Sequence, residues 1–327
     1  MNILRQKPWF GLLLMVMLVT VGSFLLLGVG SVFLKPGEVV AALQGSGSGS
    51  FIVMNYRLPR TLLAFLAGGC FALSGVLLQA IIRNPLVSPD VIGVTNGAAL
   101  FAVLTIAWIP DDPLVLTPLA ALVGAGLVMV ALMLLADHGK LQNSSFALLG
   151  IAVSAICASG TEYLLIKFPL QTNDSLVWLA GSLFGKGWTE VSVLTPVFLL
   201  FGLISWAGHR KLDVLSLSED VAIGLGLRMK RTRYRFLALA VALAGVAVAM
   251  VGSIGFLGLV APHMARRLIG HRHHLLIPMA VLVGGGLLVF ADALGRGIHP
   301  PLEIPAGLIT AIIGVPYFLY LLRKEQA

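Results

Sequence analysis

Stretches of about twenty apolar residues recur along the whole chain, and each is long enough to cross the hydrocarbon core of a bilayer. Inside lipid the backbone must satisfy its own hydrogen bonds, so a spanning segment is a helix or part of a closed barrel. The apolar runs are continuous rather than alternating, which favours helices. The sequence therefore predicts an all-α polytopic membrane protein, organised as a single membrane domain over residues 1–327.

About ten transmembrane helices are expected from these runs. A more polar segment, 170–189, lies between the fifth and sixth spans and is expected to form a short helix or loop at the membrane interface. The second and seventh spans should run in opposite directions, which is compatible with an inverted repeat relating helices 2–5 to helices 7–10. The expected spans are 10–34, 58–82, 91–109, 114–136, 144–168, 190–208, 232–251, 254–269, 275–297 and 304–323.

The distribution of basic residues predicts which side of the membrane each loop faces. If the N-terminus is cytoplasmic and the chain crosses ten times, sixteen of the 22 Lys and Arg residues fall in cytoplasmic loops. Such a bias is the usual signature of membrane orientation, so both termini are expected to be cytoplasmic. The formal net charge of +8 is then explained without a nucleic-acid partner.

Motifs for bond chemistry are absent from the sequence. It contains no G-x-x-x-x-G-K-[ST], H-E-x-x-H, C-x-x-C or G-x-S-x-G, so we expect no P-loop nucleotide site, no cofactor and no enzymatic activity in this chain. The run His271 to His274 can bind a metal in principle, but a solvated cytoplasmic turn is the simpler interpretation. No metal site is therefore predicted.

Three arginines stand out at the outer side, where the orientation predicts few bases. Arg57 and Arg60 lie in "YRLPR", and Arg296 ends the ninth span. They are either anchors that reach the interface or a docking surface for carboxylates of an external partner. Within the spans, Asp292 is placed to pair with Arg296 one turn away. Glu162 either lines a watery vestibule or bonds to a neighbouring helix.

Two cytoplasmic loops carry most of the polar pattern. In the first, which follows the second span, Pro85 and Pro89 rigidify the turn, Asp90 is expected to cap the third span, and the loop can project Asn84 and Leu86 into a pore.

The second, at about 209–232, is the longest, and Ser218 is expected to cap a short helix there, with Glu219 and Asp220 in its first turn. Ala222 and Gly224 should keep one side thin, and Gly226 should end it in a left-handed conformation. This helix either lies on the membrane or docks on a cytoplasmic partner. Docking is favoured because no bulky apolar face is evident.

Five blocks of sequence together resemble the permease subunits of bacterial ABC importers for iron–siderophore complexes, haem and vitamin B12. The resemblance covers nearly the whole chain, and the last block is most similar to the ferric citrate branch. The blocks are "YRLPR", "GVLLQAIIRNPLVSPDVIGVTNGA", "WLAGSLFGKGW", "GSIGFLGLVAPHMARR" and "HPPLEIPAGLITAIIGVPYFL".

The resemblance implies a transport function and a set of partners. It implies a permease of the bacterial cytoplasmic (inner) membrane that passes a ferric siderophore, with haem or a corrinoid as the alternative cargo. The partners would be two ATPase subunits that hold ATP and Mg, a second permease subunit, identical or homologous, and an extracytoplasmic binding protein. A secondary transporter is the rival class, although the expected spans offer little beyond Glu162 as a midplane ion site.

The resemblance also implies roles for particular residues. The loop at 209–232 becomes the coupling segment for the ATPase, where Ser218 stands in place of the usual glycine. Arg57, Arg60 and Arg296 become docking residues for the binding protein. The cytoplasmic gate corresponds to Asn84, Leu86, Asn143 and Ser144. The coupling residues are Leu217, Ser218, Glu219, Asp220, Ala222, Leu225 and Gly226.

Overall fold

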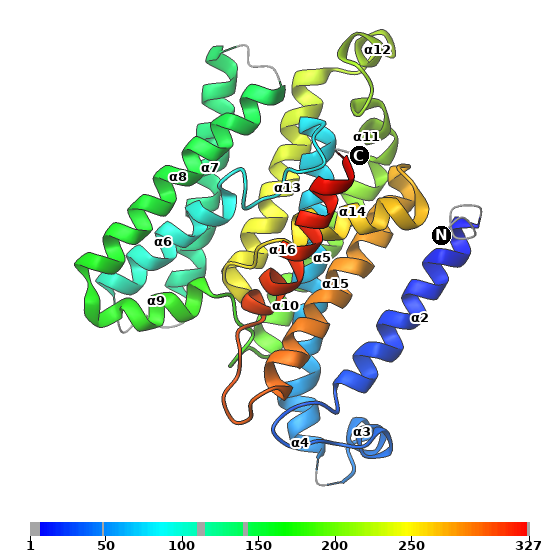
Figure 1. Ribbon diagram of the computed structural model, residues 1–327, viewed down its shortest axis with the longest axis vertical. Helices are drawn as coiled ribbons and strands as arrows, with labels where there is room; N and C mark the ends of the chain where they lie inside the picture. The colour runs from blue at the N-terminus through cyan, green and yellow to red at the C-terminus, as the bar shows by residue number, and fades with distance from the viewer. Residues whose placement is uncertain (1–6, 48, 110–114, 140–142, 326–327) are drawn as a thin grey trace.

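Helices make up the regular structure of the chain, as the apolar runs predict. The computed structural model describes residues 7–47, 49–109, 115–139 and 143–325 (Figure 1), and every regular element in these ranges is helical. The all-α prediction is therefore confirmed. The longer helices are α2 (Pro8–Leu26), α5 (Leu58–Ile82), α6 (Val94–Trp108), α7 (Leu116–Gly139), α8 (Asn143–Lys167), α10 (Trp188–Ala207), α13 (Met229–Val251), α14 (Leu257–Ile269), α15 (His273–Gly297) and α16 (Ala306–Glu325). The shorter ones are α3 (Pro36–Leu43), α4 (Ser50–Ile52), the π-helical turn η1 (Val53–Arg57), the 3₁₀ turn η2 (Pro169–Gln171), α9 (Thr172–Leu179), α11 (His209–Leu215) and α12 (Glu219–Gly224).

Each of the expected spans overlaps one of the longer helices. Among the described residues, 7 helices are long and apolar enough to cross a membrane. Two further apolar stretches are shorter, α6 and the part Ala306–Tyr320 of α16, and α14 has 13 residues. The chain is thus a multi-pass membrane protein, while the count of ten crossings and the sidedness of the termini stay predictions. The polar segment between the fifth and sixth spans forms α9, as expected.

Helix α5 is the axis of the bundle. Every residue from 67 to 82 is buried, and α5 packs against α10, α13, α14 and α15. Helices α6, α7 and α8 flank this centre on one side, and α2 stands on the other (Figure 1). Helix α12 lies at one end of the molecule, and α3 and α4 lie at the opposite end (Figure 1).

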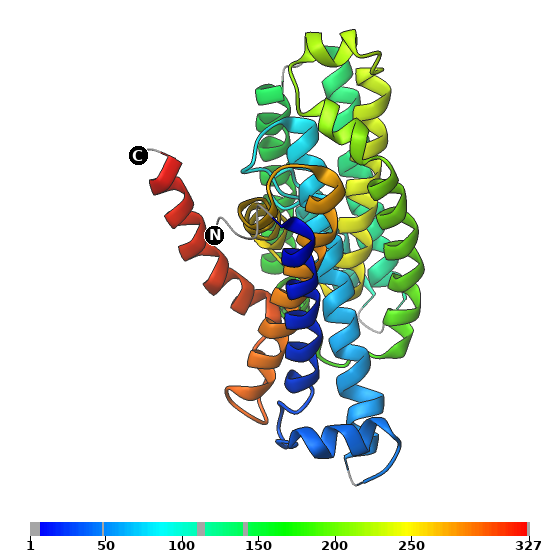
Figure 2. The ribbon, with the colours of Figure 1, turned by 90° about the vertical axis from the view of Figure 1, so that its right-hand side faces the viewer.

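Two helices depart from the common direction. In Figure 2, α14 is seen almost end-on, because it crosses the bundle at a steep angle to α5 and α15. Helix α16 leans away from the rest of the molecule along its length (Figure 2). The segment before α14 is unwound, with Gly252 and Phe256 both at positive φ, 77° and 66°. This break is why the eighth span is so short.

Glycines let α5 approach its neighbours at backbone distance. A Cβ on Gly75 would lie 1.9 Å from the carbonyl oxygen of Gly258 in α14, and one on Gly68 would lie 2.3 Å from that of Gly284 in α15. In lipid, helix association depends on such close packing because no hydrophobic force drives apolar helices together. These glycines are therefore packing positions between α5 and its neighbours.

The first helix ends earlier than the sequence indicates. We expected a span over 10–34, but α2 ends at Leu26 and the chain turns back before α3. The N–H of Leu34 donates to the carbonyl of Gly28 at 2.9 Å, and a Cβ on Gly28 would lie only 2.4 Å from the oxygen of Leu34. Hydropathy could not show this turn, because the residues that form it are as apolar as the helix itself.

Substitution of Gly75 by Val tests the close crossing of α5 and α14. Overpacking costs about 1–3 kcal/mol when side chains can adjust, and here the obstacle is backbone that cannot move aside. We expect Gly75→Val to lower the thermal unfolding midpoint of the detergent-solubilised chain strongly. The matched control is Gly126→Val in α7, where a Cβ would meet nothing within 4 Å. Equal midpoints for the two variants would contradict the packing described here.

Candidate functional sites: a coupling surface and a buried charge cluster

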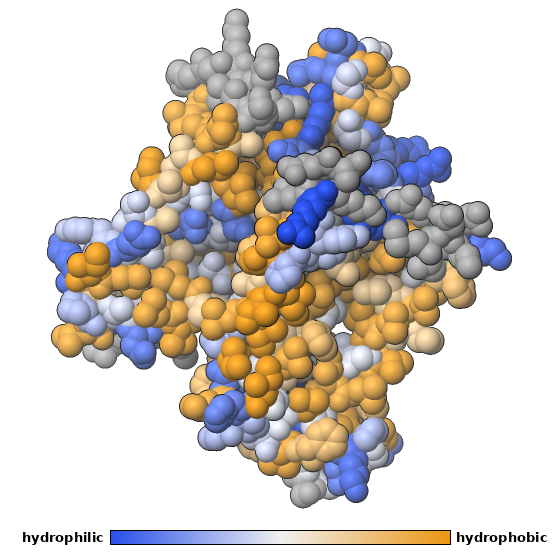
Figure 3. Space-filling view, in the orientation of Figure 1, coloured by the Kyte–Doolittle hydropathy of each residue, from blue (hydrophilic) through white to orange (hydrophobic). Residues whose placement is uncertain are grey.

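The predicted coupling segment forms two short helices at one end of the molecule. Helix α11 packs against α5 and α15, and α12 packs against α13. Figure 3 shows hydrophilic and apolar residues side by side at α12, whereas much of the surface farther down the molecule is apolar. The segment therefore stands clear of the apolar belt, at a place that a water-soluble partner can reach.

The ends of α12 are defined by Ser218 and Gly226. Ser218 has the extended conformation of an N-cap, φ −60° and ψ 153°, but its side chain makes no capping hydrogen bond. At the other end Gly226 has φ +81°, its N–H donates to Ile223 at 2.8 Å, and the N–H of Leu227 donates to Ala222 at 3.0 Å. This pair of bonds is a Schellman motif. The left-handed end is therefore confirmed, whereas the cap at Ser218 is made by backbone alone.

The exposed side of α12 differs from the one we expected. Ala222 is completely buried against the protein, so the small residue does not give a thin outer surface. The outer surface carries large apolar side chains instead. These are Leu217, Val221, Ile223 and Leu225, which are 45%, 49%, 55% and 63% exposed. The expectation that this helix lacks a bulky apolar face was wrong, because the sequence did not show which side of so short a helix rests on α13.

Hydrogen bonds fasten the coupling segment to the long helices. Arg83, at the end of α5, donates from Nε to the carbonyl of Leu215 at 2.9 Å. Arg233 of α13 lies 3.3 Å from the Glu219 carboxylate. Burial lowers the pKa of Arg83; nearby Arg233 lowers it further, and Glu219 opposes this. The base-rich end of α13 therefore holds α12 in place through Glu219.

A third fastening joins α11 to α15. The Asp213 carboxylate accepts the backbone N–H of His273 at 3.0 Å and lies 2.6 Å from its Nδ1. Asp213 thus caps the start of α15 from another helix. Sequence reasoning missed Asp213 and His273, since a cap supplied from 60 residues away leaves no local pattern.

The predicted gate residues occupy two separate helix ends. Asn84 follows α5, and its side-chain oxygen accepts the N–H of Leu86 at 2.9 Å, which fixes a tight turn. Both residues are partly exposed. Asn143 and Ser144 begin α8, and their side chains lie outside the described part of the structure. The gating role of these four residues stays a prediction.

Asp90 does not cap the third span as expected. Helix α6 begins at Val94, and its N-cap is Gly93 at φ +86°. The intervening residues form successive turns, in which Gly93 donates to the carbonyl of Asp90 at 3.2 Å and Val94 donates to that of Pro89 at 3.0 Å. The prediction failed because the left-handed glycine moves the helix start four residues downstream of Asp90.

A buried charge cluster lies at the opposite end, where α5 begins and α15 ends. Arg60 contacts Asp292 through Nη2 at 2.7 Å and Nε at 2.8 Å, and it contacts Glu303 through Nη1 at 2.7 Å. The expected pair of Asp292 with Arg296 is present, at 3.2 Å. The cluster therefore joins α5, α15 and the loop before α16.

Arg57 does not join this cluster but binds the turn that follows α2. Its guanidinium donates to the carbonyls of Leu27 and Gly28 at 2.9 and 3.1 Å, and to that of Val32 at 2.5 Å. These carbonyls follow the end of α2, where no helical partner is left for them. Arg57 therefore holds the turn that ends α2.

The three arginines predicted to dock a binding protein are thus engaged inside the chain. Arg57, Arg60 and Arg296 are only 5%, 8% and 5% exposed. Glu303 is the member of the cluster that reaches the surface, with its side chain 26% exposed. The docking role stays a prediction, and a partner would meet the loop that carries Glu303 before it met Arg60. Glu162 is exposed on α8, and its role in the pathway also stays a prediction.

Residues 16–324 match the FecCD transport family. The chain belongs to this family. It is 46% identical to the Fe(3+)-citrate import system permease protein YfmE of Bacillus subtilis (strain 168), over 98% of this chain and 97% of that one. It is 42% identical to the Fe(3+) dicitrate transport system permease protein FecD of Escherichia coli (strain K12), over 84% and 86% of the two chains.

A solved structure has the same architecture. An ABC transporter of the metal-chelate type, in an inward-facing conformation, superposes with a TM-score of 0.84 at 30% identity. The match covers 96% of this chain and 98% of that one. Together with the apolar helices, these likenesses identify a membrane-embedded permease subunit of an ABC transporter, which is not itself an enzyme.

Removal of Arg60 tests the buried charge cluster. Taking one partner from a buried ion pair costs about 3–5 kcal/mol, because the other charge is left uncompensated. We expect Arg60→Gln to lower the thermal unfolding midpoint of the purified chain markedly. Lys186→Gln is the control, since Lys186 is more exposed and faces Glu190 at 3.6 Å. Exposed ion pairs of this kind contribute about 0.2–1 kcal/mol. A midpoint for Arg60→Gln as high as that of the control would argue against a structural role for Arg60.

Proposed function

We propose that this chain is the permease of an ATP-driven importer that passes a ferric siderophore, and ferric citrate in particular, from a binding protein into the cytoplasm. The observation that carries the proposal is the 46% identity, over nearly the full length of both chains, to a permease named for Fe(3+)-citrate import. The setting is the bacterial cytoplasmic membrane. The chain itself provides the path, which opens to one side at a time.

Energy for this transport comes from separate subunits. The sequence has no P-loop, so two cytoplasmic ATPase subunits would bind ATP and Mg. The outer surface of α12 is the proposed contact, because apolar side chains are exposed there at a hydrophilic end of the molecule. Such a patch on a protein surface usually marks an interaction site.

Motion at α12 would reach the transport path through the hydrogen bonds and the ion pair that join the coupling segment to the long helices. Arg83, Arg233 and Asp213 join the coupling segment to α5, α13 and α15. Packed helices move as rigid bodies rather than deform. A displacement of the ATPase surface would therefore shift these three helices together. A second permease subunit, identical or homologous, would complete the path.

Reconstitution tests the proposed function. The permease, the ATPase subunits and the binding protein are placed in liposomes, and uptake of radiolabelled ferric citrate is measured with and without ATP. We expect uptake only with ATP and all components, and competition by unlabelled ferric citrate. Uptake driven by a proton or sodium gradient without ATP would show a secondary transporter instead. ATP-dependent uptake of another ferric chelate alone would retain the importer and replace its substrate.

Substitution of Ile223 tests the coupling surface. A carboxylate in the centre of an apolar contact is left desolvated and unpaired. Ile223→Asp is therefore expected to reduce ATPase co-purification and uptake at least tenfold, with normal membrane insertion. Lys211→Gln on α11 is the matched control, because it changes the net charge equally at an exposed site of the same segment. Unchanged uptake by Ile223→Asp would exclude this surface as the ATPase contact.

A further inference from the structure

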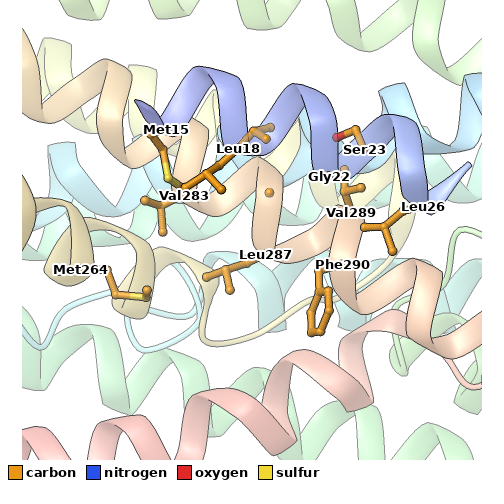
Figure 4. A pocket seen from close by; sticks show the side chains of 12 residues that line it. Met15, Leu18, Gly22, Ser23, Leu26, Met264, Val283, Leu287, Val289 and Phe290 are labelled. Atoms are coloured by element: carbon orange, nitrogen blue, oxygen red, sulfur yellow. The ribbon is translucent and has the colours of Figure 1, made fainter. Parts of the chain in front are cut away.

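An apolar cavity lies between α2 and the bundle, beside the contact of α2 with α15. It has a volume of about 250 Å³ and lies between α2, α14 and α15. Figure 4 shows Met15, Leu18 and Leu26 of α2 on one side, with Met264, Leu287 and Phe290 on the other. Ser23 is the one polar side chain among the residues that line it.

Glycine keeps this space open. Gly22 of α2 lines the cavity, and a Cβ placed on it would meet nothing within 4 Å. The contact of α2 with α15 is nevertheless close beside it, because a Cβ on Gly286 would lie 3.0 Å from Val19. The helix is therefore held against α15 while a gap remains along it. The surface is hollowed between α2 and the bundle in Figure 3 as well.

Hydrocarbon is the material that suits this gap. Water in a cavity needs two to four polar partners, and the lining offers the hydroxyl of Ser23. Helices α2 and α15 both have the length and apolarity to cross a bilayer. The cavity lies along the middle of α15 and the second half of α2, so it opens where lipid tails are the surrounding solvent. The outward side chains of α2 are also apolar and exposed, including Leu13 at 68% and Met17 at 58%.

The charges near one end of the cavity favour an anionic headgroup. Met15 and Met264 lie toward the end at which α2 begins and α14 runs into α15 (Figures 1 and 4). Lys7 precedes α2 and Arg272 precedes α15, and both are exposed. Neither α2, α14 nor the part of α15 before Ala291 contains an Asp or Glu. Lys7 is eight residues before Met15, about 12 Å along a helix, which suits a headgroup at the interface above an inserted chain.

We propose that this cavity is a phospholipid site, in which one acyl chain of an anionic phospholipid inserts between α2 and α15 and the headgroup lies by Lys7 and Arg272. The bound acyl chain fills the space beside Gly22 and completes the packing of α2. The site is separate from the coupling surface and from the charge cluster. It would hold lipid whether or not ferric citrate is the transported substrate.

Native mass spectrometry of the full-length chain, released from mild detergent after membrane extraction, tests the site. The wild type is expected to retain one phospholipid per chain under activation that strips loosely held lipid. Gly22→Leu fills the cavity, so the fraction of protein that retains this lipid should fall at least tenfold. Gly126→Leu in α7 is the matched control, because a Cβ there also meets open space and Gly126 is not among the residues that line this cavity. Equal retention by the two variants, or retention of detergent only, would overturn the proposal.

Two further measurements distinguish binding of the acyl chain from binding of the headgroup, and loss of lipid from misfolding of the variant. Ser23→Leu fills the same cavity from the next position, so it should lose lipid even where Gly22→Leu fails to fold; full retention would count against the site. Lys7→Glu with Arg272→Glu is tested in nanodiscs with equal phosphatidylglycerol and phosphatidylcholine. Wild type should retain phosphatidylglycerol at least fivefold in excess, and the double variant should lose this preference. No preference in the wild type would refute the anionic headgroup.

Discussion

Backbone contact between α5 and its neighbours is the constraint on which the rest of the structure depends. Apolar helices gain little from touching one another in lipid, so close approach and polar bonds must hold them. Gly68 and Gly75 give α5 that approach to α15 and α14. Polar bonds add to it at the same depth: the hydroxyl of Ser74 donates to Ala240 of α13 at 2.7 Å, and Gln79 donates to Gly258 of α14 at 3.3 Å.

The two candidate sites at the ends of the molecule are built on this centre. At one end Arg60 joins α5 to α15 through Asp292, and at the other Arg83 joins α5 to the coupling segment. Under the proposed function, a displacement of α12 would be transmitted through these bonds to the long helices. In the proposed importer, this arrangement would let an event at the predicted cytoplasmic surface change the path near the opposite end.

The sequence predicted the features that local pattern controls. Apolar length placed the spans, and glycine chemistry placed the end of α12 at Gly226. It could not show contacts between distant segments. Arg60 meets Asp292 across 232 positions, so a residue that resembles an exposed arginine at a helix entrance is buried. The buried side of α12 could not be predicted either, because a six-residue helix is too short to show a helical period. The expectation that Ala222 lies on the outer surface failed for this reason. A substitution such as Ala222→Asp would consequently disturb folding of α12 as well as docking.

The most direct test of the account is to find what touches the outer surface of α12 in the assembled transporter. Both native cysteines, Cys70 and Cys157, are buried, so a photo-cross-linker attached to Ile223→Cys would report on that position alone. The account predicts that irradiation of the intact complex joins Ile223→Cys to the ATP-hydrolysing subunit, identified by mass spectrometry of the linked peptide. Cross-links to lipid or to the permease itself, with none to an ATPase, would contradict it.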